Sequence, residues 1–305
     1  MKVAITGATG FLGHHLVGYL AGVGHECIAL SRDPRRAAKA GFPAAVSVRP
    51  AGDLPPVDAV IHLAGESIVG WWTPWKRRRI FASRIDGTRR LVEAMRAMPV
   101  PPRVLLGASA VGYYGHRPGE TLDETAAPDS RGRFRSKVCV AWERAALEAE
   151  TLGVRVVLLR LGNIIALDGG FLGRLLPLYR AGPFIVGQPE AKLSWISRED
   201  AVRLIAFALE KEEVRGPLNV VAPHAVTQHA LATTLAERLG RRVIGSIPSR
   251  LVRAVLGEFA DAVLDEQEVV PAKALAAGFQ FRHPAWRNCL DALFNSARCH
   301  SRGGA

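Results

Sequence analysis

Cysteine and long hydrophobic runs are both scarce in this sequence. Only four cysteines occur among 305 residues, and none of them forms a Cys-x-x-Cys pair. This scarcity argues against a disulfide-rich secreted scaffold and against a structural metal site. Charged or polar residues interrupt every apolar stretch, so no segment is predicted to span a membrane. Because an apolar strand begins directly after Met1, we also expect no targeting peptide, and hence a protein of the reducing cytoplasm.

Acidic residues are in the minority, with 28 Asp and Glu against 40 Lys and Arg, which gives a formal net charge of +12. A nucleic-acid-binding surface would gather basic residues on one stripe with aromatic residues among them. Here they are spread along the chain, and the densest run, residues 76–79, lies in a predicted helix where it would face solvent. An anionic cofactor explains the excess more simply. We therefore expect neither nucleic acid nor a membrane among the partners.

Short strands alternate with amphipathic helices through the first half of the chain. Strands are expected at residues 3–5, 25–30, 45–48, 59–63, 104–106 and 154–160, and helices at residues 74–98 and 136–151. Thr73 is a candidate N-cap, with Pro74 at the first helical position. Helices that join parallel strands require right-handed crossovers, so the predicted fold is a Rossmann-type, doubly wound parallel α/β sheet.

The alternation loosens after Arg160, where we expect strands at residues 193–196 and 218–221 and helices at residues 199–209 and 227–239. The sequence thus predicts a Rossmann domain over residues 1–160, with later contributions from about residues 193–222. Residues 161–295 are predicted to form a smaller mixed α/β substrate lobe. Residues 296–305 carry little apolar content and are predicted to be a flexible tail.

A glycine-rich turn connects the first strand to the first helix. Gly7, Gly10 and Gly13 have the Gly-x-x-Gly-x-x-Gly spacing, and Leu12 and Leu16 begin an amphipathic helix. A turn of this kind lets backbone N–H groups approach a pyrophosphate at a helix N-terminus. We therefore predict a dinucleotide site here, made by Gly7, Thr9, Gly10, Phe11, Leu12 and Gly13.

The end of the second strand distinguishes NAD from NADP. An acidic residue there would bind the ribose hydroxyls, whereas Ser31 and Arg32 suit a 2′-phosphate. The alternative is that Arg32 is an ordinary surface residue. Small residues after the strand at residues 59–63 would let the backbone lie along the cofactor. The predicted NADP(H) site therefore also includes Ser31, Arg32, Leu63, Ala64, Gly65, Glu66 and Arg84.

Several further motifs accompany the glycine turn. They lie at residues 62–66 (His-Leu-Ala-Gly-Glu), 83–89, 109–115, 138–143, 194–196, 217–223 and 256–261. Together they resemble the extended short-chain dehydrogenase/reductases of the NAD-dependent epimerase/dehydratase superfamily, in particular the YfcH-like "epimerase family protein" subgroup. The C-terminal segment of that subgroup is a domain of unknown function. The resemblance extends to about Phe294 and implies an NADP-binding Rossmann protein whose substrate is not established.

The usual proton-transfer pair of the superfamily is missing. Its members use a tyrosine followed four residues later by a lysine, and none of the four tyrosines here has that neighbour. The resemblance places Arg135 and Cys139 where the tyrosine and the lysine would stand. It also places Arg84 where relatives have an asparagine before their Gly-Thr pair.

Three polar residues remain as candidates for catalysis, namely Ser109, Tyr113 and Tyr114. The resemblance puts Ser109 in the position of the serine that polarises the substrate. Tyr114 could replace the missing acid if a nearby cation lowered its pKa, or both tyrosines could simply pack the loop under the cofactor. Candidates for a substrate wall are aromatic residues that could equally pack between the lobes: Trp71, Trp72 and Trp195.

These observations favour an NADP(H)-dependent oxidoreductase or epimerase-like enzyme that lacks the Tyr-x-x-x-Lys pair. Its substrate would be a small carbonyl or hydroxyl compound, such as a nucleotide sugar. The alternative is a non-catalytic NADP(H)-binding sensor or partner-binding protein. The resemblance also suggests a homodimer through helices 74–98 and 136–151.

Overall fold

Seven parallel strands form the central sheet of the protein. The computed structural model describes residues 1–43 and 46–302. The order across the sheet is β12 (Gly216–Val220), β7 (Arg155–Leu161), β5 (Val104–Ala110), β4 (Ala59–His62), β1 (Lys2–Thr6), β2 (Glu26–Ser31) and β3 (Val46–Pro50). Every neighbouring pair is parallel. The order reverses between β1 and β4, which confirms the predicted doubly wound Rossmann-type fold.

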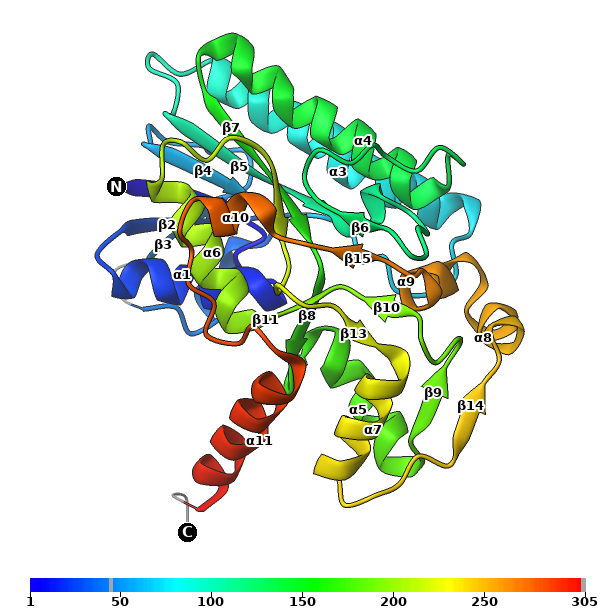
Figure 1. Cartoon of the computed structure of the whole chain (residues 1–305). Helices are drawn as coiled ribbons and strands as arrows, with labels where there is room; N and C mark the ends of the chain where they lie inside the picture. The colour runs from blue at the N-terminus through cyan, green and yellow to red at the C-terminus, as the bar shows by residue number, and fades with distance from the viewer. Residues whose placement is uncertain (44–45, 303–305) are drawn as a thin grey trace.

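Two pairs of helices cover the two faces of the sheet (Figure 1). Helices α3 (Pro74–Arg96) and α4 (Phe134–Leu147) lie side by side on one face, and α1 (Phe11–Gly22) and α6 (Arg198–Glu210) on the other. Alternate residues of β1 point to opposite faces of the sheet. Val3 and Ile5 join the core under α1 and α6, whereas Ala4 joins the core under α3 and α4.

The start of α3 follows the predicted capping pattern. The Thr73 side chain accepts a hydrogen bond from the Lys76 amide, and Pro74 occupies the first turn. Beyond β7 the chain leaves the sheet and then returns in α6 and β12, so residues far apart in sequence complete one domain.

The second lobe lies below the sheet in Figure 1. Its elements are β8 (Asn163–Ala166), α5 (Gly170–Ala181), β9 (Phe184–Val186), β10 (Lys192–Leu193), β11 (Trp195–Ser197), β13 (Val226–Thr227), α7 (Gln228–Arg238), β14 (Gly245–Ile247), α8 (Ser249–Leu256), α9 (Asp261–Leu264) and α11 (Trp286–Arg302). Their apolar side chains form a separate core that includes Trp195, Leu231 and Trp286. Two short elements of the C-terminal segment return to the sheet domain: β15 (Glu268–Val269) pairs with β6 (Thr121–Leu122), and α10 (Ala272–Ala276) packs near β12.

The structure departs from the sequence predictions at a few places. Ala45, where the third strand was expected to begin, lies outside the described residues. The strand expected at residues 193–196 is divided into β10 and β11, because these two segments pair with different partners. The flexible tail predicted for residues 296–305 is wrong up to Arg302, because α11 continues to that residue; residues 303–305 are not described. A short helix, α2 (Pro34–Ala38), was not predicted.

Within the described part of the chain, no helix is both long and apolar enough to cross a bilayer. The same residues contain no group of three or more His, Cys, Asp or Glu side chains that could hold a metal ion.

Candidate functional site

The glycine turn between β1 and α1 is packed so tightly that side chains are excluded. Gly7 has a φ of +70°, and a Cβ there would lie 2.8 Å from the amide nitrogen of Ala64. A Cβ on Gly13 would overlap the carbonyl oxygen of Gly7. The motif therefore brings the start of α1 against the ends of β1 and β4, which is the position a dinucleotide requires.

The N-terminus of α1 is open to an anionic ligand. Among the described residues no side chain caps this helix, and its first turn carries no acidic residue. Its first N–H groups have no partner within the helix and add to the positive end of the helix dipole. Phe11 is covered by the second lobe, since a Cβ on Gly169 would lie 2.7 Å from its ring. The tight turn and the open helix end together fit a pyrophosphate.

Ser31 and Arg32 stand beside this turn. Ser31 is the last residue of β2 and Arg32 follows it; β2 pairs with β1, with Leu30 opposite Thr6. The Ser31 hydroxyl accepts a hydrogen bond from the Asp33 amide at 3.2 Å, and the Arg32 side chain is exposed. An exposed guanidinium next to the glycine turn fits a 2′-phosphate.

The end of β4 contains a buried histidine whose role the sequence did not reveal. His62 Nδ1 lies 2.6 Å from Thr6 Oγ1, and this hydroxyl oxygen also accepts a hydrogen bond from the Ala64 amide at 3.3 Å. Burial lowers the pKa of His62 to about 4, so the ring is neutral near pH 7. Its Nε2 is buried without a hydrogen-bond partner among the described residues.

Glu66 and Arg84, both predicted to bind the cofactor, are held by contacts within the chain. The Glu66 carboxylate is held by Lys76 at 2.7 Å and by Arg79 at 3.0 Å, and the Lys76 hydrogen bond lowers the pKa of Glu66. The Glu66 backbone is also engaged, because its amide donates to the Ser83 hydroxyl at 2.9 Å. Arg84 donates to the Glu66 carbonyl at 2.9 Å and faces Gly65, where a Cβ would lie 3.3 Å from its Cζ.

Ser109 and Tyr114 belong to a buried network behind the loop that follows β5. Ser109 donates to Glu143 at 2.7 Å, and Arg160 Nε donates to the same Glu143 oxygen at 2.9 Å. Arg160 Nη1 also donates to the Tyr114 hydroxyl at 2.9 Å, and this hydroxyl in turn donates to Asn219 at 2.7 Å. All five side chains are buried.

This network overturns the condition under which Tyr114 was expected to act as an acid. A cation does adjoin the phenol, but burial dominates and raises the pKa of Tyr114 to about 12. Burial alone would lower the pKa of Arg160, but the hydrogen bond and charge of Glu143 raise it instead. Ser109 likewise points into the protein. Tyr113 is less buried, and the Arg160 guanidinium lies 3.6 Å from the centre of its ring.

The positions of the missing tyrosine and lysine lie on α4. Arg135 donates to Asp265 at 3.2 Å, and its guanidinium nitrogens lie 3.2 Å from where a Cβ of Gly112 would be. Cys139 is buried beside the backbone of Ala110, and burial raises the pKa of its thiol to about 11. Neither group resembles the phenol–ammonium pair it replaces.

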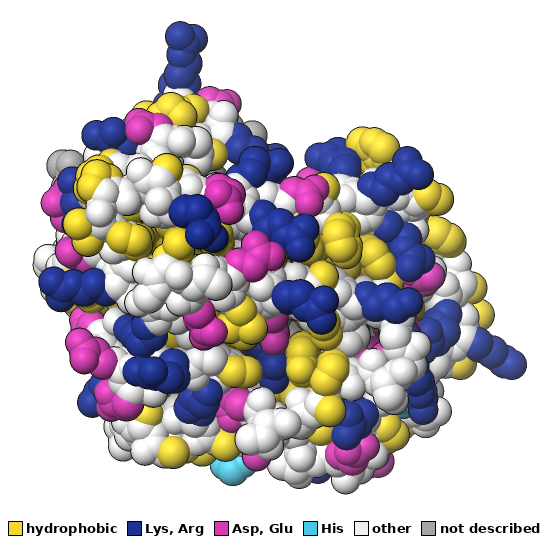
Figure 2. Space-filling model, turned by 90° about the horizontal axis from the view of Figure 1, so that it is seen from above, with side chains coloured by type: hydrophobic (Ala, Val, Ile, Leu, Met, Phe, Trp, Pro, Cys, Tyr) yellow, Lys and Arg dark blue, Asp and Glu magenta, His cyan; other side chains and the backbone are white. Residues whose placement is uncertain are grey.

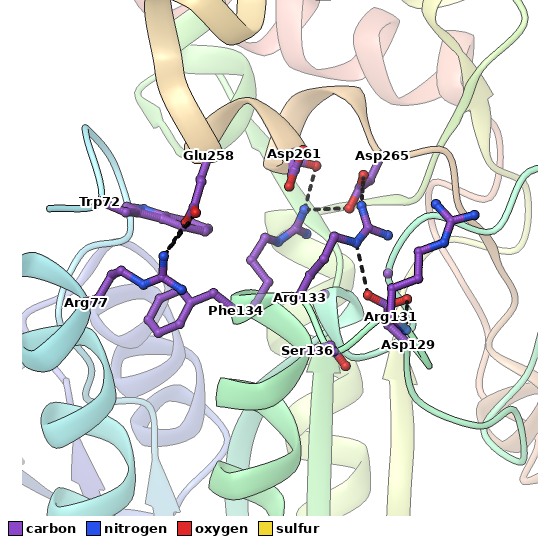
Figure 3. Close-up of a pocket in the computed structure, with 14 residues that line it drawn as sticks. Trp72, Arg77, Asp129, Arg131, Arg133, Phe134, Ser136, Glu258, Asp261 and Asp265 are labelled. Atoms are coloured by element: carbon purple, nitrogen blue, oxygen red, sulfur yellow. Dashed lines mark hydrogen bonds and ion pairs between the residues drawn. The ribbon is translucent and has the colours of Figure 1, made fainter. Parts of the chain in front are cut away.

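A pocket of about 300 Å³ lies between the start of α4 and the segment at residues 258–265 (Figure 3). Its walls include Trp72, Phe134, Arg131, Arg133, Arg135 and Asp265. The sequence alone predicted no role for this charged cluster. Only the motif at residues 256–261 pointed to its acidic residues. Burial raises the pKa of Asp265, although Arg135 and Arg133 act in the opposite direction.

The three tryptophans proposed as a substrate wall do not meet at one place. Trp72 lines this pocket, with its indole N–H donating to the Ile68 carbonyl at 2.6 Å. Trp71 is exposed and lies against Gly257. Trp195 fits the packing alternative, because its side chain is fully buried, packs against Trp286 and donates to the His224 carbonyl.

Two segments of the chain match known protein families. Residues 3–221 match the NAD dependent epimerase/dehydratase family, and residues 247–293 match a domain of unknown function (DUF1731). The epimerase family protein YfhF of Bacillus subtilis is 33% identical over 297 residues, covering 96% of this chain and 98% of that protein. An Arabidopsis thaliana relative, the chloroplastic SDR39U1 homolog, is 33% identical over 96% of this chain and 86% of its own length.

Solved structures show the same relationship. The crystal structure of human epimerase family protein SDR39U1 (isoform 2) with NADPH has a TM-score of 0.86 and 30% identity, and the match covers 97% of this chain and 99% of that one. UDP-glucuronic acid 4-epimerase from Bacillus cereus, solved with UDP-glucuronic acid and NAD, has a TM-score of 0.75, with 98% and 100% covered. Its identity is only 17%, so that likeness concerns the fold alone. These matches confirm the resemblance inferred from the motifs.

Proposed function

Because this chain belongs to the NAD dependent epimerase/dehydratase family, we propose that it is an NADP(H)-dependent oxidoreductase or epimerase-like enzyme acting on a small carbonyl or hydroxyl compound. The observation that carries the proposal is the packed glycine turn with the open N-terminus of α1 beside it. The NADPH bound by human SDR39U1 supports the choice of cofactor. A bound nicotinamide would supply or accept hydride.

The chain's own residues would hold the cofactor at three places. Backbone N–H groups of residues 9–13 would bind the pyrophosphate, and Ser31 and Arg32 would bind the 2′-phosphate. The small residues 63–65 would leave room for the rest of the nucleotide at the end of β4.

Tyr113 is the better of the two tyrosines as a proton donor. It is only partly buried, whereas the Tyr114 hydroxyl is committed to Asn219 and Arg160. Burial raises the pKa of Tyr113 as well, although Arg160 acts in the opposite direction, so it is partial exposure and not acidity that favours this phenol. Ser109, with its hydroxyl on Glu143, would position α4 against β5 rather than touch the substrate.

NADPH titration followed by nucleotide fluorescence tests the cofactor assignment. Arg32→Ala should weaken NADPH binding about tenfold or more, since a charge-assisted hydrogen bond to phosphate is removed, and should leave NADH binding unchanged. Arg241→Ala, which removes an exposed arginine of the second lobe, is the control for net charge. Equal losses for both nucleotides, or for both variants, would refute the role of Arg32.

A second candidate function is a non-catalytic NADP(H)-binding protein. Two observations favour it: Ser109 and Tyr114 are buried, and Arg135 and Cys139 stand where the family has its proton-transferring tyrosine and lysine. A panel of aldehydes, ketones and nucleotide sugars distinguishes the two functions. Consumption of NADPH that is lost in Tyr113→Phe but kept in Tyr114→Phe supports the enzyme, and tight NADPH binding without turnover on any compound supports the sensor.

A further inference from the structure

The pocket in Figure 3 lies beside the loop that follows β5. One wall is the start of α4, and the opposite wall comes from residues 258–265 of the C-terminal segment. Gly112 and Ser136 also line it, and the Ser136 hydroxyl donates to the Tyr113 carbonyl at 2.9 Å. A molecule in this pocket would therefore contact Gly112, the neighbour of Tyr113 in the loop just beyond the carboxyl end of β5.

The N-terminus of α4 opens into this space. Arg133 is its N-cap residue, and no side chain among the described residues caps the helix. The first turn contains no acidic residue, so the positive end of a 14-residue helix is not neutralised from within.

Two guanidinium groups at the pocket have unused donors. Arg133 uses Nε for Asp129 at 3.0 Å and Nη1 for Asp265 at 2.9 Å, but its Nη2 is buried and has no partner in the described residues. The Arg131 side chain is exposed and makes no ion pair with any described residue. An orphaned buried N–H costs stability unless a ligand or water accepts from it.

The carboxylates around the pocket are already engaged. Glu258 pairs with Arg77 at 2.9 Å, Asp261 pairs with Arg253 at 2.5 Å, and Asp129 pairs with Arg133 at 3.0 Å. Asp265 is shared between Arg133 and Arg135. Among the residues that the structure describes, the hydrogen-bond donors that remain without a partner at the pocket are the Arg131 guanidinium, Nη2 of Arg133 and the N-terminal amides of α4.

We propose that this pocket binds the oxyanion group, carboxylate or phosphate, of a compact substrate. Arg131, the free Nη2 of Arg133 and the N-terminus of α4 are the receptors. The volume of about 300 Å³ is at the small end of the range for small-molecule sites, which suits a compact metabolite better than a whole nucleotide sugar. As a substrate site the pocket depends on the proposed function, but as an anion site it can be tested without NADPH turnover.

The test is isothermal titration of the full-length protein, saturated with NADPH, with inorganic phosphate, benzoate and UDP-glucose in separate runs. Phosphate and benzoate distinguish the two oxyanion classes, and saturation with NADPH keeps the anions away from the glycine turn. Arg131→Ala and Arg133→Lys are the test variants, and Arg241→Ala is the control that removes an equally exposed charge. Repeating the runs without NADPH separates failure of this site from failure of the cofactor site.

Phosphate or benzoate should bind the wild type and the control equally, and about tenfold more weakly to Arg131→Ala. Arg133→Lys keeps the charge but loses the planar fork, and should also bind more weakly. The proposal is overturned if neither anion binds at about 10 mM, where a millimolar site would be mostly filled. It is equally overturned if the two test variants bind as the control does, or if only UDP-glucose shows dependence on Arg131. Binding of anions without NADPH binding would sink the proposed function and leave the anion site intact.

Discussion

His62 is a single residue whose burial makes a pH dependence predictable. Its pKa falls from about 6.5 in the unfolded chain to about 4 in the folded protein. The unfolded state therefore binds more protons between those values, and stability is lost as the pH falls through this window. Between pH 7.5 and pH 5, this residue alone should cost about 2 kcal/mol of unfolding free energy.

Urea denaturation of the wild type and of His62→Gln at both pH values measures that contribution. The variant removes the titrating ring but keeps a polar group beside Thr6, so the difference in pH slope between the two proteins is the quantity of interest. If the unfolding free energies of the two proteins changed equally with pH, His62 would have the same pKa in the folded and unfolded states, contrary to its burial.

Gly13 and Gly18 offer a matched pair on the same helix. A Cβ at Gly13 overlaps the Gly7 carbonyl, whereas a Cβ at Gly18 meets no atom within 4 Å. Gly13→Ala should displace the turn, lower the melting temperature and weaken NADPH binding. Gly18→Ala should stabilise the protein by about 0.5–1 kcal/mol, since alanine is the better residue inside a helix. Thermal melting with and without NADPH checks both, and similar behaviour of the two variants would contradict the packing argument.

At this scale the sequence predicted some residues well and others poorly, for a physical reason. The glycines of the turn could be predicted because spacing along the chain determines their geometry. The choice between a site role and packing stayed open for Tyr114 and Trp195, because their burial depends on Arg160, Asn219 and Trp286, which folding brings together from distant positions. No local pattern encodes such partners.

At the scale of elements, the pair Glu143–Arg160 joins α4 to β7. Both side chains are buried, and two hydrogen bonds of 2.9 Å link them. Removing one partner of such a pair leaves the other charge buried and uncompensated. Glu143→Gln should therefore lower the unfolding free energy by about 3 kcal/mol.

Glu148→Gln is the matched control, since Glu148 pairs with Arg89 at 3.2 Å on the surface. Exposed pairs contribute about 0–1 kcal/mol, so this variant should remain close to the wild type. Urea unfolding at neutral pH compares the two. A loss at Glu143 no larger than that at Glu148 would mean that the buried pair does not hold α4 in place.

The elements of the sheet were the most predictable part of the fold. Most of its strands are short apolar runs bounded by turn residues; β4 ends one residue before its predicted range does, and β7 begins and ends one residue after its own. The short elements β6 and β15 were missed because two-residue strands have no periodicity and form only when their partner is present.

For the molecule as a whole, charge is distributed without a dominant stripe on the face shown in Figure 2. Lys and Arg side chains there lie among acidic and apolar ones. Several of the basic groups are engaged in ion pairs, such as Arg79 with Glu66 and Arg77 with Glu258. Some of the 40 Lys and Arg side chains thus connect elements of this chain through ion pairs.

The separately matched C-terminal segment, residues 247–293, is built into both lobes. Ala274 and Phe279 belong to the core under α1 and α6, and Trp286 and Leu290 belong to the core of the second lobe. Val269 pairs with Leu122 of β6. A segment that contributes to two cores is not expected to fold, or to be removed, as an independent domain.

Truncation after Ser246 should therefore also unfold the residues that remain. We expect loss of the near-UV circular dichroism signal and of cooperative thermal melting, because both cores lose buried apolar side chains. Truncation after Ser296 is the control, since Phe294 is the last described residue that packs against the second core. That shorter protein should melt close to the full chain. A cooperative transition in the protein cut after Ser246 would instead show that the sheet domain is stable alone and that the C-terminal segment only covers it.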